Sequence, residues 1–457
     1  MEQTYMKERP VVGLVLAMSL PMMLSMTVSS LYNIVDSYYV AALSEDALTA
    51  LSLVYPLQNL ITAVTIGFSV GINAAIAYFL GAGETDRAAR AAGGGLWFST
   101  VHGVVLAVGC IAVLPAFLGL FTRDAAVAEL GVRYGRIAFA FAPVVAWSMA
   151  LEKMHQAAGR MVGTMLGMLC GCVSNIVLDP VLIFGLRPFP AMGIEGAALA
   201  TGIGQTLGFA FFLGLCRVRP LPMRVDRAAF RPDRDMARTL YGVGVPAALN
   251  MALPSALVAA LNVILAADGQ VYVLALGVYY KLQTFLYLPA NGIVQGMRPL
   301  IGYNYGAGES GRVRRIYRVA LAMAGAIMAA GTVVCWAVPG ELAGLFSRNP
   351  ATVAAGARAL RIISLGFLVS AVSVISCGAL EGLGMGGPSF AISALRCGVI
   401  LIPAALVLDW AMGPAGVWHA FWITEAVTAA CAAVIYRRAL RRGRRAEGKH
   451  PPDTSRR

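Results

Sequence analysis

Four polar residues lie within apolar stretches of the first half of the chain, and their oxygen atoms could bind a proton or a cation. Asp36 lies in the first stretch, Asn175 and Asp179 in the fifth, and Thr201 in the sixth. Asn175 and Asp179 are four residues apart, so on a helix they project from the same face. Either aspartate alone could equally cap a helix or make a buried hydrogen bond. Together, these hard oxygen ligands favour a site for a shared proton or for Na⁺.

Three neighbouring residues are candidates for accessory roles. Tyr32 and Asn33 precede Asp36 by four and three residues, so a helix places them on nearly the same face. Glu152 adjoins Lys153 near the end of the fourth apolar stretch, so it either takes part in function or pairs with that lysine.

The stretches that carry these residues are long enough to cross a bilayer. The chain has 457 residues, of which 58% are hydrophobic and only 13% are charged, whereas a soluble domain carries about 25% charged residues. Apolar runs of about 20 residues span a hydrocarbon core of ~30 Å. A carboxylate inside such a run costs at least ~2.5–3.5 kcal/mol to insert, so it needs a functional reason. The pattern predicts an all-α polytopic membrane protein with twelve transmembrane helices, at 14–40, 52–80, 94–121, 134–157, 163–185, 195–216, 240–266, 272–303, 316–339, 359–383, 388–410 and 415–436.

The second half of the chain repeats the first at an offset of 225 residues. Pro21 matches Pro246, Gly67 matches Gly292, and Gly-Ala-Gly-Glu at 81–84 recurs at 306–309. Such repeats are typical of transporters that bind their substrate between two lobes. The repeat predicts two pseudo-symmetric six-helix lobes, with boundaries at 1–216 for the N-lobe, 217–238 for a cytoplasmic linker, 239–440 for the C-lobe and 441–457 for a basic disordered tail.

The membrane acids do not follow the repeat. The residues 225 positions after Asp36 and Asp179 are Leu261 and Ala404. Two acids of the second half, Glu381 and Asp409, fall near span ends, and we expect them to be solvated. The ionic chemistry is therefore expected in the first lobe. Pro21, fifteen residues before Asp36, is either a static kink or a hinge that responds to the charge of Asp36.

The distribution of charge indicates orientation in the membrane. The net charge is +13, and the Arg and Lys residues gather at both termini and in the even-numbered loops. By the positive-inside rule, both termini are expected in the cytoplasm of a bacterium, with the protein in its cytoplasmic membrane. The basic residues do not form a nucleic-acid-binding surface. The eight cysteines lie in or beside apolar spans and do not indicate a disulfide framework.

Several motifs resemble the multidrug and toxic compound extrusion (MATE) family over nearly the whole chain. They are Asn-Ile-Val-Asp at 33–36, both Gly-Ala-Gly-Glu turns, Asn-Ile-Val-Leu-Asp-Pro-Val-Leu-Ile-Phe-Gly at 175–185, and Gly-Ile-Glu-Gly-Ala-Ala-Leu-Ala-Thr at 193–201. The resemblance is strongest to the DinF-like and MepA-like branch. It implies a multidrug antiporter that exports cationic or amphipathic compounds in exchange for H⁺ or Na⁺. It also implies a coupling-ion site at Asp36, Asn175, Asp179 and Thr201.

The chain departs from family patterns at two positions. Pro254 stands where the NorM branch has a glutamate, and Glu381 stands where a glutamine is common. The rival hypothesis is a flippase for a lipid-linked saccharide, which would favour extra spans and several deep basic residues. The arginines of this chain mostly lie in loops, and Arg298 and Arg396 are the notable exceptions. No Walker sequence or nucleophile elbow is present, so we expect a non-enzymatic, monomeric transporter of small molecules without a cofactor other than the coupling ion.

Overall fold

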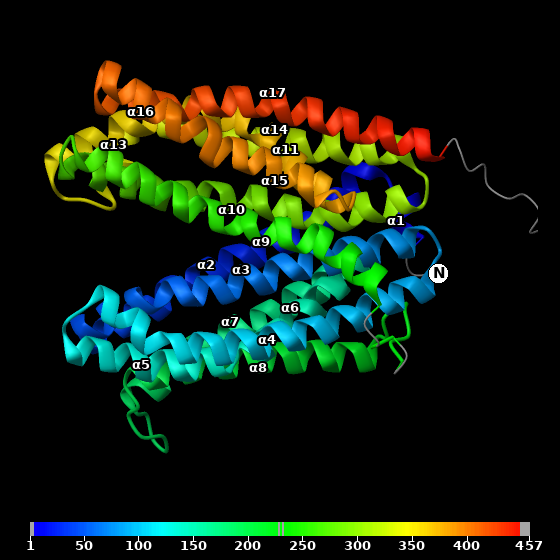
Figure 1. The fold of residues 1–457 in the computed structure, drawn as a ribbon, viewed down its shortest axis with the longest axis horizontal. Coiled ribbons are helices and arrows are strands. Elements are labelled where there is room, and N and C mark those ends of the chain that lie inside the picture. The colour runs from blue at the N-terminus through cyan, green and yellow to red at the C-terminus, as the bar shows by residue number, and fades with distance from the viewer. Residues whose placement is uncertain (1–3, 227–228, 231–232, 448–457) are drawn as a thin grey trace, which may run out of the picture. The chain divides into compact units, whose positions relative to one another are not determined.

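The computed structural model describes residues 4–226, 229–230 and 233–447, with side chains to Arg441. The described residues form helices joined by short turns, and no strand occurs among them (Figure 1). Most of the predicted disordered tail, 441–457, lies outside the described residues, as do residues 227–228 and 231–232 of the predicted linker. The last helix continues to Glu447, into the segment predicted as the tail.

Each half of the chain forms a similar series of helices. The first half contains α1 (Tyr5–Glu8), α2 (Val11–Leu43), α3 (Glu45–Gly81), α4 (Thr85–Phe121), α5 (Ala125–Ala140), α6 (Ala142–Ala157), α7 (Met161–Phe184) and α8 (Ile194–Val218). The second contains α9 (Arg234–Ala266), α10 (Gln270–Gly306), α11 (Ser310–Ala337), α12 (Pro339–Gly344), α13 (Pro350–Ile363), a 3₁₀ turn (Ser364–Gly366), α14 (Phe367–Gly382), α15 (Gly386–Ala394), a π-helical segment (Leu395–Ile400), α16 (Leu401–Met412) and α17 (Pro414–Glu447).

These helices account for the predicted membrane spans. Within the described residues, eleven spans are long and apolar enough to cross a membrane. The bent pair α5 and α6, which meet at 44°, makes a twelfth if the two helices are counted together. The all-α polytopic membrane fold predicted from the apolar runs is therefore confirmed.

The repeat is visible in the backbone. The Gly-Ala-Gly-Glu turns place Gly83 and Gly308 at φ values of 76° and 74°, a left-handed conformation that costs glycine least. The caps repeat as well. The Asp124 side chain accepts from the backbone N–H of Ala126 at the start of α5, and Asn349 accepts in the same way at the start of α13. Sequence repetition therefore reproduces helix starts and turns.

The contacts of the chain gather into two compact units, which we describe separately. One comprises Leu24–Ala248, and the other comprises Met1–Met23 with Leu249–Arg457. The first part of α2 thus belongs with the second half of the chain, and the first part of α9 belongs with the first half. The predicted lobe boundaries differ from these units by that exchange.

Matched glycines permit the exchanged helix segments to pack closely. A Cβ on Gly67 of α3 would lie 2.4 Å from Cα of Ala248 in α9. A Cβ on Gly292 of α10 would lie 2.7 Å from Cα of Met23 in α2. Gly292 follows Gly67 by 225 residues, and Ala248 follows Met23 by the same number. The same contact therefore occurs once in each unit. The repeated glycines thus have a packing role.

Candidate ion-binding site in the first half

Helices α7 and α8 hold three of the four predicted site residues together. The two helices pack along one another (Figure 1), and a Cβ on Gly204 of α8 would lie 2.8 Å from the carbonyl oxygen of Gly171 on α7. This close approach brings Thr201 to Asn175. With its amide oriented to satisfy both ends, Asn175 donates to Asp179 Oδ2 at 3.0 Å and accepts from the Thr201 backbone N–H at 3.0 Å and hydroxyl at 3.2 Å.

Burial makes this arrangement energetically demanding. Asp179 is fully buried, and Asn175 is 2% exposed. A buried ionised carboxylate is unfavourable unless hydrogen bonds or an opposite charge compensate for lost water. The Asn175 amide supplies one hydrogen bond to Asp179. Its orientation is fixed in turn by Thr201, so the three residues act as one polar group inside the helix pair.

Asp36 of α2 completes the set. Its side chain is partly buried, and its charge interacts with that of Asp179. Its Oδ1 atom is buried and has no hydrogen-bond partner among the described residues. Buried polar atoms are nearly always satisfied, so such an oxygen suits a bound proton or cation. Asn175, Asp179 and Thr201 therefore form one hydrogen-bonded cluster, and the charge of Asp36 interacts with its carboxylate.

Two residues that the sequence did not single out adjoin this cluster. The side chain of Tyr134 on α5 is 1% exposed and interacts with the charges of Asp36 and Asp179. Its hydroxyl also interacts with the side chain of Gln58 on α3. A tyrosine and a glutamine inside apolar spans were the available signals. Both residues lie far from Asp36 in the sequence, so no local pattern linked them to it.

The predicted accessory residues divide into two groups. Tyr32, one turn before Asp36, interacts with the charges of Asp36 and Asp179. Asn33 is exposed, and its side chain donates to the carbonyl of Ser29 at 2.7 Å, within its own helix. Tyr32 therefore belongs to the cluster in this structure, whereas Asn33 does not.

Glu152 lies in a separate polar group on α6. Its Oε1 accepts from Lys153 Nζ at 2.8 Å and from Gln156 Nε2 at 2.7 Å. Gln156 Oε1 also accepts from Lys153 Nζ, at 3.1 Å. All three residues are almost completely buried. The structure thus gives Glu152 the paired arrangement that the sequence had left open as one of two alternatives.

Pro21 lies inside α2, which continues through it as a helix. The boundary between the two compact units falls shortly after it, between Met23 and Leu24. The matched Pro246 in α9 stands in the same relation to the boundary between Ala248 and Leu249. Proline removes a backbone hydrogen bond from the helix at each of these places. A hinge at Pro21 stays a prediction, and the nearby unit boundary is a position at which a hinge could act.

The expectation that Glu381 and Asp409 are solvated is wrong for Glu381. Glu381 is 6% exposed and accepts from Arg298 Nη2 at 2.6 Å. Asn250 Nδ2 and Ser389 Oγ donate to its other oxygen. Glu381 lies near a helix end, but packing of α14 against α10 buries it. Asp409 is partly buried at the end of α16.

The expectation that ionic groups are confined to the first half is also incomplete. Glu425 of α17 is 9% exposed, and it pairs with Arg396 of the π-helical segment. The sequence contained the signal, because both residues fall well inside predicted spans. The prediction included Arg396 as a deep arginine but did not include Glu425.

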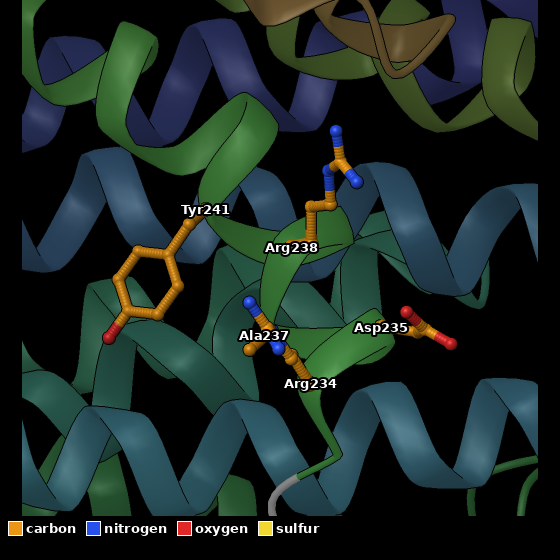
Figure 2. A pocket seen from close by; sticks show the side chains of 5 residues that line it. All are labelled: Arg234, Asp235, Ala237, Arg238 and Tyr241. Atoms are coloured by element: carbon orange, nitrogen blue, oxygen red, sulfur yellow. The ribbon is translucent and has the colours of Figure 1, made fainter.

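The cavity at the start of α9 is unrelated to these clusters. It has a volume of about 570 Å³ and is lined by Arg234, Asp235, Ala237, Arg238 and Tyr241. Figure 2 shows that Arg238, Asp235 and Tyr241 point in different directions from one helix. The Tyr241 hydroxyl is engaged with His102 Nε2 at 2.8 Å. Since these side chains do not converge, the cavity does not assemble a polar site.

Comparisons with known proteins agree with the two-fold organisation. The MatE family model matches twice, at residues 21–181 and 246–407. The multidrug export protein MepA of Staphylococcus aureus (strain bovine RF122 / ET3-1) is 27% identical over 441 residues, covering 94% of each chain. MepA of Staphylococcus haemolyticus is 26% identical over 432 residues, again with 94% of each chain covered.

Solved structures share the fold. A crystal structure of MATE in complex with MaL6 aligns with a TM-score of 0.91 and 23% identity, covering 97% of this chain and 100% of that one. A MOP superfamily transporter from Pyrococcus furiosus aligns with a TM-score of 0.90 and 22% identity, covering 97% and 99%. The resemblance expected from the sequence motifs is thus confirmed. Since the family model matches more than half of the chain and covers both repeats, the protein belongs to the MATE family.

Proposed function

We propose that this protein is a secondary antiporter that exports cationic or amphipathic compounds in exchange for H⁺ or Na⁺. Membership of the MATE family and the similarity to multidrug export proteins support the transport role. The observation that carries the coupling role is the buried Oδ1 of Asp36, which lacks a hydrogen-bond partner within the described chain and belongs to a carboxylate whose charge interacts with that of Asp179.

The chemistry of coupling follows from repulsion between the two carboxylates. In a medium of low polarity, a proton or a small cation relieves that repulsion. The hydrogen bond that Asn175 donates to Asp179 fixes the position of this carboxylate. If one conformation of the transporter binds the ion more tightly than the other, ion binding shifts the conformational equilibrium. Substrate binding then favours the opposite conformation, and the exchange of the two drives export.

The alternative, a flippase for a lipid-linked saccharide, gains less support. The expectation for that class was additional spans and several deep basic residues. The described chain has eleven to twelve candidate spans. Its two deep arginines, Arg298 and Arg396, are each neutralised by a glutamate. We therefore favour the antiporter, acting as a monomer in a bacterial cytoplasmic membrane.

The identity of the coupling ion is tested by reconstitution. Purified protein in liposomes is loaded with ethidium, and a proton gradient or a sodium gradient is imposed separately. We expect one gradient, or both, to drive ethidium transport above the rate without a gradient. Transport that is equally fast without any gradient would contradict the antiporter proposal.

A further inference from the structure

Among the described residues, three ion pairs are largely buried, and one of these three is more exposed than the others. The side chains of Lys153 and Glu152 are 4% and 3% exposed, and those of Arg298 and Glu381 are 10% and 8% exposed. The side chain of Arg396 is 24% exposed, while that of its partner Glu425 is 12% exposed. The guanidinium of Arg396 is therefore the most exposed charged group among these three pairs.

The pair lies deep within its spans. Arg396 follows the start of its span, Gly386–Met412, by ten residues, and Glu425 follows the start of its span, Pro414–Arg441, by eleven. At 1.5 Å per residue both lie about 15 Å from the helix ends, near the centre of a hydrocarbon core of ~30 Å. Ionisable residues at this depth are rare and mark substrate or ion pathways.

The surroundings of Glu425 form a complete carboxylate-binding position. Arg396 Nε donates to Glu425 Oε1 at 2.6 Å, and Ser373 Oγ donates to Oε2 at 3.3 Å. Arg396 Nη2 also contacts the Tyr287 hydroxyl at 3.3 Å, and that hydroxyl lies 2.7 Å from Ser370 Oγ. Guanidinium groups recognise carboxylates with specific geometry. The Arg396 guanidinium and the Ser373 hydroxyl thus hold the Glu425 carboxylate, and the Tyr287 hydroxyl contacts that guanidinium.

Local backbone geometry distinguishes Arg396 from the other buried cations. It lies within the π-helical segment Leu395–Ile400, between the α-helical segments α15 and α16. π-Helical segments are rare and frequently occur at functional sites. The Arg396 guanidinium also lies 5.8 Å from the ring centre of Tyr287, which can support a cation when its anionic partner leaves.

We propose that Arg396 binds the carboxylate of zwitterionic substrates, and that Glu425 is the internal carboxylate that a substrate displaces. The site lies wholly within the unit that contains Leu249–Arg457. The inference rests on the proposed transport function, because it assigns a substrate group to a residue of the second half.

The test compares norfloxacin with its ethyl ester. Both carry a protonated amine, but the ester lacks the carboxylate. Binding to purified wild-type protein and ion-driven transport in liposomes are measured for each compound. The variants are Glu425→Gln, which removes the internal competitor, and the double variant Arg396→Gln/Glu425→Gln, which removes both charges and leaves no unpaired ion.

We expect wild-type protein to bind norfloxacin more tightly than the ester. Glu425→Gln should strengthen norfloxacin binding by about tenfold and leave the ester unchanged, because a charge-assisted hydrogen bond is no longer contested. The double variant should bind both compounds equally. Transport of the ester by wild-type protein shows that the transport proposal holds independently of this site.

Three results would overturn the assignment. Equal binding of norfloxacin and its ester to wild-type protein excludes a carboxylate site, and this arm requires no variant to fold. A double variant that keeps a preference for norfloxacin places recognition elsewhere. A Glu425→Gln variant that weakens both compounds alike supports a structural role for the pair instead.

Discussion

At the scale of single residues, the buried carboxylates differ in what compensates their charge. Glu152, Glu381 and Glu425 each pair with a lysine or an arginine. Asp179 is instead held by the amide of Asn175, and Asp36 keeps one buried oxygen without a protein partner in the described chain. A fixed cation neutralises a buried carboxylate, whereas a carboxylate without one can take up a proton or a small cation. This contrast favours the two aspartates for coupling.

Removal of Glu152 should destabilise the protein. Glu152→Ala leaves Lys153 buried without its carboxylate, and breaking a buried pair in this way costs about 3–5 kcal/mol. Thermal unfolding in detergent should show a clear decrease in Tm. The double variant Glu152→Gln/Lys153→Met, which removes both charges, should recover most of the loss. An unchanged Tm with abolished transport would instead assign Glu152 to coupling.

Removal of the Tyr134 hydroxyl should alter ion binding without unfolding the protein. Tyr134→Phe keeps the ring, which is buried in the apolar core of its unit, but removes a hydrogen-bonding group beside the two aspartates. A net hydrogen bond contributes about 0.5–1.5 kcal/mol. We expect the apparent affinity for the coupling ion to change by about two- to tenfold. The matched control, Tyr38→Phe, alters an exposed side chain and should have no effect.

At the scale of helices, matched glycines set the distance between the exchanged segments. The Cβ atoms that alanine would add at Gly67 and Gly292 meet neighbouring backbone at 2.4 Å and 2.7 Å. Real Cβ atoms do not approach backbone so closely, so the helices must separate or bend. The repeated packing at these two glycines therefore depends on the absence of a side chain.

Alanine at these glycines should destabilise the protein by about 1–3 kcal/mol, the usual effect of overpacking. Gly277→Ala is the matched control, because Gly277 also lies within a helix but has no atom within 4 Å of the added Cβ. That control should be neutral or slightly stabilising, since alanine favours helix. Thermal unfolding of Gly67→Ala, Gly292→Ala and Gly277→Ala distinguishes these effects. Equal Tm values for all three would contradict the packing account.

The elements were largely predictable from the sequence because their signals are local. Apolar length predicted the spans, and the repeat predicted paired turns. The four-residue spacing of Asn175 and Asp179 predicted their shared helix face. The contact of Tyr134 with the aspartates, and the burial of Glu381, depend on packing between distant helices. The first part of α2 packs with the second half of the chain, and the first part of α9 packs with the first half. This grouping also depends on packing between distant helices, so no local sequence pattern predicted it.

At the scale of the whole molecule, the repeat supplies two similar scaffolds with different chemistry. The first half holds the aspartate cluster, and the second half holds two arginine–glutamate pairs. The bias of basic residues predicts that both termini face the cytoplasm. Reporter fusions test this orientation. A C-terminal fluorescent protein that matures in the cytoplasm should be bright, whereas alkaline phosphatase fused at the same place should be inactive. The reverse pattern would contradict the orientation.

The most direct test of the account measures transport by Asp36→Asn in liposomes. An imposed ion gradient tests coupling, and exchange of labelled for unlabelled tetraphenylphosphonium tests substrate movement alone. Asp46→Asn, which alters an exposed acid at the start of α3, serves as the matched control. We predict that Asp36→Asn retains exchange and loses gradient-driven transport, while the control keeps both. Gradient-driven transport by Asp36→Asn at the wild-type rate would contradict the central claim that this carboxylate couples ion movement to export.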